Sequence, residues 1–219
     1  MSESQPNSAQ SLLAICGIIG PILYSIMVIT LGLFRPNYNH ITQIMSELGE
    51  VGAPNAVIMN TAGFILLGLL MIFFALGLHR GISEGEGSKI GPALVAVSGA
   101  FLVLLGIFPC DPGCANESSV GIAHEVFAMM HGFAMIFAPL AIAQRLKKDS
   151  RWQGYLYYSL ATGVVVAVLA SLYGFNVFEP WKGASQRVLM GVPLLWVEVM
   201  AIKLLLLSIL SSACARAAS

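Results

Sequence analysis

Charged residues are scarce in this chain. Only 10% of its 219 residues are Asp, Glu, Lys or Arg, whereas 57% are hydrophobic. A soluble domain needs roughly a quarter of its residues charged to face water, so this composition excludes an ordinary soluble domain and indicates that lipid is the main solvent. The formal net charge is zero, and the lack of a basic surface or an acidic tail argues against nucleic acid as a partner.

The N-terminus lacks the features of a secretory signal. Its first residues are polar and contain no Lys or Arg, whereas a signal peptide begins with a positive segment. The first apolar run is also too long for a signal core, so we expect it to remain as a spanning helix. The alternating ten-residue strands of a membrane β-barrel are missing as well.

Long apolar runs are abundant. A helix of about 20 residues crosses a hydrocarbon core of about 30 Å. Stretches that meet this length are 12–34, 56–79, 90–108, 120–142, 155–178 and 186–210. The predicted fold is therefore an all-α integral membrane bundle of six transmembrane helices over 12–210, with polar tails at 1–11 and 211–219.

Lys and Arg are distributed unevenly over the connecting segments. One side would carry Arg80, Lys89, Arg145, Lys147, Lys148, Arg151 and Arg216, and the other would carry Arg35, Lys182 and Arg187. Cytoplasmic loops carry the excess of positive residues in membrane proteins. We therefore predict a multi-pass protein of the cell membrane with both termini in the cytoplasm, and we call the opposite loops the outer loops.

The first outer loop is too apolar for a plain solvated link. Four apolar residues recur at helical spacing: Ile41, Ile44, Met45 and Leu48. Asn39 fits a helix N-cap and Gly49 a helix stop, which predicts a short amphipathic helix at the outer membrane surface. Its other face would carry His40, Gln43 and Glu47. This face either displays ordinary polar residues or acts as a lid over the next loop.

The second outer loop is the most specific part of the sequence. Asp111-Pro112-Gly113 places Pro and Gly at the central positions of a type II turn, which would bring Cys110 and Cys114 together. An oxidising exterior favours a disulfide between them. Free thiols and metal ligation stay open as alternatives, although C-x3-C is not the usual zinc spacing.

Two histidines follow on the fourth predicted span. His124 and His131 lie seven residues apart, on one helical face, and His131 would lie about 10 Å below the outer helix end. Ionisable groups at such depth normally face a partner or water. Glu198 of the last span has a comparable depth, so we predict that it approaches His131. The alternative is a neutral His131 that bonds between packed helices.

These residues predict a polar site at the outer face. Its candidate catalytic residues are His40, Ser46, Glu47, Asp111, His124, His131 and Glu198. Arg35, Lys182 and Arg187 are the candidates for binding an anionic head group, although Lys182 and Arg187 would serve equally as anchors of a helix end. Within this set a histidine would be the general base or the ligand of a divalent metal, and Ser46 the nucleophile.

Three classes of function fit this site. The first is a membrane-embedded hydrolase or transferase acting on a lipid or another amphiphile from the outer leaflet. The second is a proton-linked transporter of small molecules, in which Glu198 and His131 exchange protons. The third is a non-catalytic binding or assembly subunit. The sequence does not decide whether the protein is an enzyme.

Two loop motifs carry a family resemblance. The strings R-P-N-Y-N-H-I-T-Q-I-M-S-E-L-G-E-V-G-A-P-N and F-P-C-D-P-G-C, followed by a His at the start of the fourth span, resemble the DUF998 family of bacterial and archaeal membrane proteins. The resemblance covers essentially the whole chain and implies a six-span membrane protein, without an activity to transfer. It marks these positions as family pattern: Arg35, Pro36, His40, Ser46, Glu47, Leu48, Gly49, Asp111, Gly113 and His124.

Overall fold

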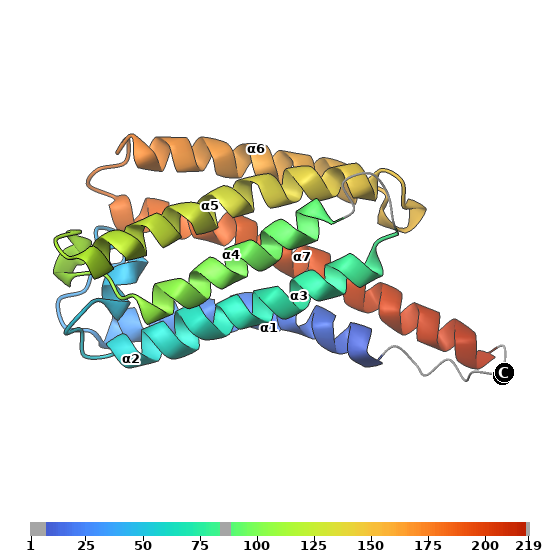
Figure 1. The fold of residues 1–219 in the computed structure, drawn as a ribbon, viewed down its shortest axis with the longest axis horizontal. Coiled ribbons are helices and arrows are strands. Elements are labelled where there is room, and N and C mark those ends of the chain that lie inside the picture. The colour runs from blue at the N-terminus through green and yellow to red at the C-terminus, as the bar shows by residue number, and fades with distance from the viewer. Residues whose placement is uncertain (1–7, 84–88, 218–219) are drawn as a thin grey trace.

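A computed structural model describes residues 8–83 and 89–217, and these residues form helices and loops without a β-strand (Figure 1). The long helices are α1 (Ser8–Phe34), α3 (Leu66–Gly81), α4 (Ile90–Ile107), α5 (Ser119–Leu146), α6 (Tyr155–Gly174) and α7 (Lys182–Ala217). The short elements are η1 (Met45–Gly49), α2 (Ala56–Ile58), η2 (Met59–Ile65), η3 (Pro112–Cys114) and η4 (Ser150–Trp152).

Six segments are long and apolar enough to span a membrane, which confirms the predicted all-α bundle of six spans. The second span is continuous over Ala56–Gly81, because η2 joins α2 to α3 as a π-helical turn. The helix ends differ from the prediction. Helix α1 begins at Ser8 and α7 runs from Lys182 to Ala217, so parts of both predicted tails are helical, while 1–7 and 218–219 lie outside the described residues.

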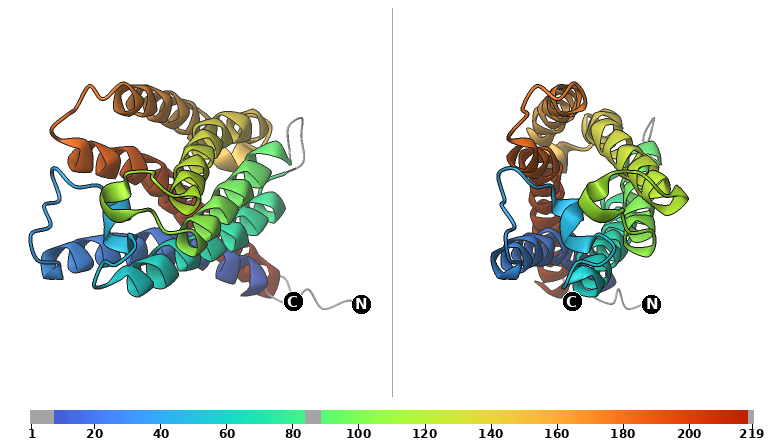
Figure 2. Two further views of the ribbon diagram at one scale, coloured as in Figure 1. Left: turned by 60° about the vertical axis from the view of Figure 1, so that its left-hand side comes forward. Right: turned by 90° about the vertical axis from the view of Figure 1, so that its left-hand side faces the viewer.

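The six spans form a ring. Neighbours around it are α1, α3, α4, α5, α6 and α7, and α7 packs back against α1 (Figure 2). Apolar side chains such as Phe74, Met135 and Trp196 fill the interior, and each is at most 1% exposed. Helices α3 and α4 approach closely because Gly68 and Gly99 face each other's carbonyl oxygens, where a Cβ would clash.

The two ends of the ring differ in character. One end, which we call the capped end, carries the segments 35–55, 108–118 and 175–181 (Figure 2). At the other, the tail end, α1 begins and α7 finishes (Figure 1). Buried Arg145 at the end of α5 donates to the carbonyls of His79, Ile82 and Ser83, so it satisfies backbone acceptors at the end of α3.

The amphipathic helix predicted in the first outer loop is present only as the short 3-10 helix η1. Met45 and Leu48 are buried as expected, whereas Ile41 is exposed. Asn39 does accept from the Ile41 N–H at 2.8 Å, and the Gln43 side chain accepts from the Asn39 N–H at 2.8 Å. These side-chain hydrogen bonds compete with the backbone bonds of a helix, so the segment around Asn39 and Gln43 does not join η1 in one continuous helix.

Candidate functional site at the capped end

The predicted disulfide joins Cys110 and Cys114. The predicted turn is present as well, because the Cys114 N–H donates to the Asp111 carbonyl at 2.7 Å and Gly113 has φ +64°. A positive φ at the third turn residue is what a type II turn requires and what glycine allows. The disulfide and the turn therefore form one rigid loop over the end of α4.

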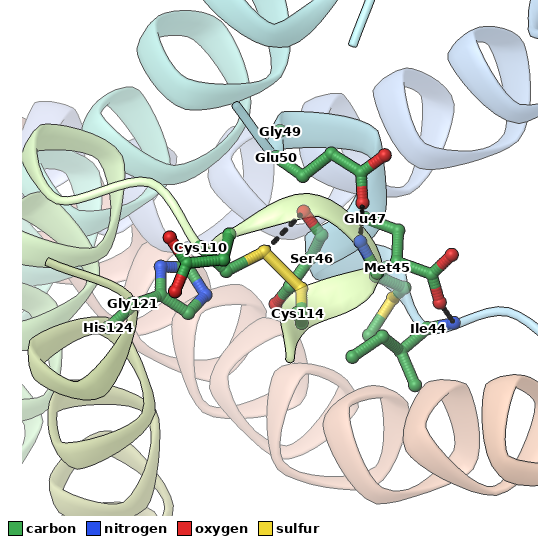
Figure 3. Close-up of a disulfide and its surroundings, with 12 residues drawn as sticks. Ile44, Met45, Ser46, Glu47, Gly49, Glu50, Cys110, Cys114, Gly121 and His124 are labelled. Atoms are coloured by element: carbon green, nitrogen blue, oxygen red, sulfur yellow. Dashed lines mark hydrogen bonds between the residues drawn. A yellow bond between two sulfur atoms is a disulfide. The ribbon is translucent and has the colours of Figure 1, made fainter. Parts of the chain in front are cut away.

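Glu50 joins the disulfide loop to the first outer loop. One carboxylate oxygen lies 2.6 Å from Arg35 Nη2, and the other accepts from the Gly113 N–H at 2.6 Å. The Val51 N–H also donates to the Cys110 carbonyl at 2.9 Å. Figure 3 shows η1 and the disulfide turn packed side by side. The two outer motifs found in the sequence thus form one structural unit.

Asp111 turns toward the start of α5. Its carboxylate accepts from the Ser118 N–H at 2.7 Å and the Ser118 hydroxyl at 2.6 Å. These bonds, the one from the hydroxyl first, hold the pKa of Asp111 below its ordinary value. A Cβ on Gly121 would overlap this carboxylate, so glycine is needed there. Asp111 therefore anchors the start of α5 through its carboxylate.

Arg187 links the start of α7 to the first outer loop. It donates to the carbonyls of His40 and Gln43 at 2.7 and 2.9 Å, and to the Tyr38 hydroxyl at 2.6 Å. It also donates to His40 Nδ1 at 3.1 Å. Arg35 is similarly engaged, by Glu50 and by the Glu47 carbonyl. Both arginines are therefore held by the protein itself, whereas the side chain of Lys182 makes no hydrogen bond within the described residues.

Glu47 and Ser46 lie in η1. The Glu47 carboxylate accepts from the Ile44 N–H at 3.0 Å and from Gln43 Nε2 at 2.7 Å, so it stabilises its own loop. The Ser46 carbonyl lies 3.5 Å from Cys110 Sγ and is drawn beside the disulfide in Figure 3. No hydrogen bond from the Ser46 hydroxyl to another described residue is present.

His124 lies beneath the disulfide turn, and only 3% of it is exposed. Its Nδ1 is 2.7 Å from the Phe108 carbonyl oxygen, which can only accept, so Nδ1 carries the hydrogen. The neutral ring then has its lone pair on Nε2. This nitrogen is buried, and no group of the described residues donates to it. Figure 3 places the ring in the surroundings of the disulfide.

The predicted approach of His131 and Glu198 is wrong. His131 Nδ1 is 2.8 Å from the Ser98 hydroxyl on α4, and Nε2 is 3.4 Å from Met190 Sδ on α7. Glu198 follows Met190 by eight residues, about 12 Å along α7. Helix α7 begins at Lys182, before the predicted span 186–210, so Glu198 lies deeper along its helix than that span implied. The alternative prediction, a histidine bonded between packed helices, describes His131.

The structure thus assembles part of the predicted site. Ser46, Glu47, His124 and the disulfide lie together at the capped end (Figure 3). In the loops of the same end, Asp111 binds Ser118 and His40 binds Arg187. Within the described residues no group of three or more His, Cys, Asp or Glu could hold a metal ion, so the geometry assigns no ligand set to a divalent metal.

Sequence reasoning missed several partners at this end. Glu50 follows the predicted helix stop and is not among the predicted site residues, yet it is only 7% exposed. Ser118 precedes α5, where an N-cap serine gives a recognisable signal, and its hydroxyl accepts from the Gly121 N–H at 3.0 Å. Tyr38 carries no such signal, because its partner Arg187 is distant in the sequence.

Comparison with known proteins agrees with the loop motifs. A family model described as "Protein of unknown function (DUF998)" matches residues 18–203. Neither a curated protein nor a solved structure matches the chain. The matched range includes both outer motifs and most of the six spans. Because it covers far more than half of the chain, this membrane-type helical protein belongs to the DUF998 family.

Proposed function

We propose that the protein is a membrane-embedded hydrolase or transferase of the cell membrane, acting on an amphiphile at the outer leaflet with His124 as its general base. Both tails lie in the cytoplasm in this proposal, which places the capped end outside. The observation that carries it is the buried acceptor His124 Nε2, to which no described group donates.

A buried polar atom without a partner calls for an explanation. Here the Phe108 carbonyl fixes the tautomer of His124, and this kind of bond orients the imidazole in histidine bases generally. The lone pair on Nε2 is therefore ready to accept a proton from a hydroxyl group or a water molecule. In this respect His124 differs from His131, whose two nitrogens both face protein groups.

The neighbours of His124 limit the chemistry. No hydrogen bond joins Ser46 to His124 among the described contacts, so we assign the nucleophile to water or to a ligand hydroxyl. His124 would take the proton as that oxygen attacks an ester group, and would return it to the leaving oxygen. Exposed apolar residues of α5, such as Ile122 and Val126, allow an amphiphile to reach this level of the bundle from the lipid.

A non-catalytic binding subunit is the second candidate, favoured by the bonding of Arg35, Glu47, Glu50 and Arg187 within the cap. Side chains held in this way stabilise a preformed surface and cannot move freely through a reaction. The transporter hypothesis loses its proton-carrying pair, because His131 contacts Ser98 and Met190 in place of Glu198.

The variant His124→Gln tests whether His124 acts as the general base of an enzyme. The purified chain in nanodiscs made from a mixed lipid extract is assayed by mass spectrometry for released fatty acid and head groups. Glutamine can still donate to the Phe108 carbonyl, but it cannot act as a base, so turnover should fall by roughly 100-fold or more.

The matched control is Glu117→Gln, which changes an exposed carboxylate of the loop before α5 and should leave turnover unchanged. Equal rates in wild type and His124→Gln would remove His124 from the chemistry. A wild-type protein that releases no product from any of the lipids would instead favour the binding subunit.

A further inference from the structure

The tail end contains a cavity of about 260 Å³. It lies between the first turns of α1, the end of α3 and the last part of α7, with one residue from the η4 segment. Its lining residues are Ala9, Gln10, Arg80, Gly81, Arg151, Leu204, Leu207, Ser208 and Ser211. Arg80 and Ser211 at its edge are exposed, so a ligand can reach it from outside the bundle.

The polar side of this cavity carries two arginines. Among the described residues that line it there is no Asp or Glu. Arg151 is bound to Asp149, with Nη2 at 2.6 Å from Oδ2, and its hydrogen bonds hold the pKa of Asp149 well below the ordinary range. Arg80 makes no side-chain hydrogen bond or ion pair with another described residue, so its guanidinium is available to a ligand.

Neutral polar residues complete this side. Ser208 and Ser211 line the wall that α7 contributes, where their hydroxyls donate to the carbonyls of Leu205 and Ser208. Gln10 is fixed on the opposite wall, because its Nε2 donates to the Gly77 carbonyl at 2.8 Å. Arginine is the side chain best suited to phosphate oxygens, because its guanidinium presents several donors in a fixed geometry.

The other side of the cavity is apolar. Leu204, Leu207 and Ala9 belong to the lining, and Leu12 continues from Ala9 onto the exposed surface of α1. Because the cavity lies where helices end, a charged group bound there would be level with lipid head groups, and an attached chain would lie along the apolar helices. Basic pockets between spans are known to bind lipid head groups in this way.

We propose that this cavity binds the phosphate group of a phosphorylated amphiphile, with Arg80 as its principal charged contact and Ser211 beside it. The site is at the opposite end of the ring from His124. It therefore stands independently of the function proposed for the capped end.

The variant Arg80→Gln tests this site in the full-length protein. The protein is reconstituted in nanodiscs of phosphatidylcholine with a small share of phosphatidic acid, and the bound phosphatidic acid is counted by native mass spectrometry. Loss of one charge-assisted contact should weaken binding by about tenfold. Lys147→Gln is the matched control, because it removes an exposed cation near the same end that does not line the cavity.

A second variant separates binding from folding. Ser211→Asp places a negative charge on the exposed edge of the cavity and should also expel phosphatidic acid, whereas Ser211→Ala should bind it nearly as wild type does. The proposal is overturned if Lys147→Gln weakens binding as much as Arg80→Gln, or if neither Arg80→Gln nor Ser211→Asp weakens it. If an equal concentration of inorganic phosphate displaced the lipid, the proposal of an amphiphilic ligand would be wrong, since the apolar wall would then contribute nothing to the affinity.

Discussion

Arg187 illustrates how one side chain fixes a loop whose residues lie far away in the sequence. Its guanidinium donates to the carbonyls of His40 and Gln43 and lies 5.7 Å from the centroid of the Tyr38 ring. The guanidinium of Arg35 lies 5.6 Å from the same centroid. Cation–π contacts of this kind add to the hydrogen bonds. A substitution of Arg187 would release the loop, so loss of activity in such a variant would not identify a substrate contact.

The environment of His40 predicts a pH-dependent stability. Burial, and then the charge of Arg187, lower the pKa of His40 from its ordinary value of 6.5. The unfolded chain therefore binds a proton more readily than the folded one, and the stabilisation by neutral His40 is lost as pH falls through the folded pKa. The melting temperature should decrease from about pH 7.5 to about pH 5, as measured by thermal unfolding in detergent.

The variant His40→Gln isolates this effect. Glutamine retains an oxygen that can accept from Arg187 but does not titrate, so its melting temperature should change less over the same pH range. Around His40 the facing groups are Arg187 from α7, Tyr38 from its own loop and Gly32 from α1. An identical pH response in the variant and the wild type would assign the effect to another group.

The local turn in the outer loops could be predicted from the sequence, but the long-range hydrogen-bond partners of the loop residues could not. Asp111 and the two cysteines form a turn whose contacts are local, and the Pro-Gly pair specified it correctly. The bond between Arg187 and His40 spans 147 residues and depends on how α7 is placed in the ring. No local pattern encodes that placement.

At the scale of elements, two very short helices join the first and second outer loops at the capped end. The 3-10 helices η1 and η3 are too short to be stable alone, and Glu50 joins them through Arg35 and the Gly113 N–H. Replacing Glu50 by Gln leaves Arg35 without its counter-charge at a site where the two side chains are 17% and 10% exposed.

We expect Glu50→Gln to lower the free energy of unfolding by about 2 kcal/mol. Denaturant titration of the purified protein, followed by tryptophan fluorescence, measures this change. Glu117→Gln serves as its control, since Glu117 is an exposed carboxylate in the same loop region and should shift stability by less than about 0.5 kcal/mol. Equal effects of the two variants would show that Glu50 does not join the elements.

The spans were predictable because apolar length alone identifies a transmembrane helix. Their ends were less predictable, since polar residues such as Ser8 and Lys182 continue a helix beyond the apolar run. The π-helical turn Met59–Ile65 had no sequence signal at all. It turns Asn60 so that Nδ2 donates to the Gly49 carbonyl at 2.8 Å, which ties the second span to η1.

At the scale of the whole molecule, the ring separates two polar ends by an apolar middle. Depth along each helix decides which residues meet, and a sequence gives depth only relative to the uncertain end of its own span. This is why Glu198 was placed opposite His131, whereas Met190 occupies that level. For the same reason the sequence indicated Arg80 only as one of the positive residues of the connecting segments, although it lines the cavity formed by α1, α3 and α7.

Two independent features support the orientation that we propose for the ring in the membrane. The positive residues concentrate at the tail end, which favours the cytoplasm, and the disulfide lies at the capped end, which favours an oxidising exterior.

Helix α7 has 36 residues, about 54 Å, so its exposed Cys214 extends beyond a hydrocarbon core of about 30 Å. A membrane-impermeant maleimide applied to expressing cells should therefore label Cys214 only after permeabilisation, and should label Thr42→Cys, in a Cys214→Ser background, in intact cells. Labelling of Cys214 in intact cells would show that the orientation is opposite to the proposed one. The disulfide would then lie in a reducing compartment and the arginine cavity at the outer leaflet.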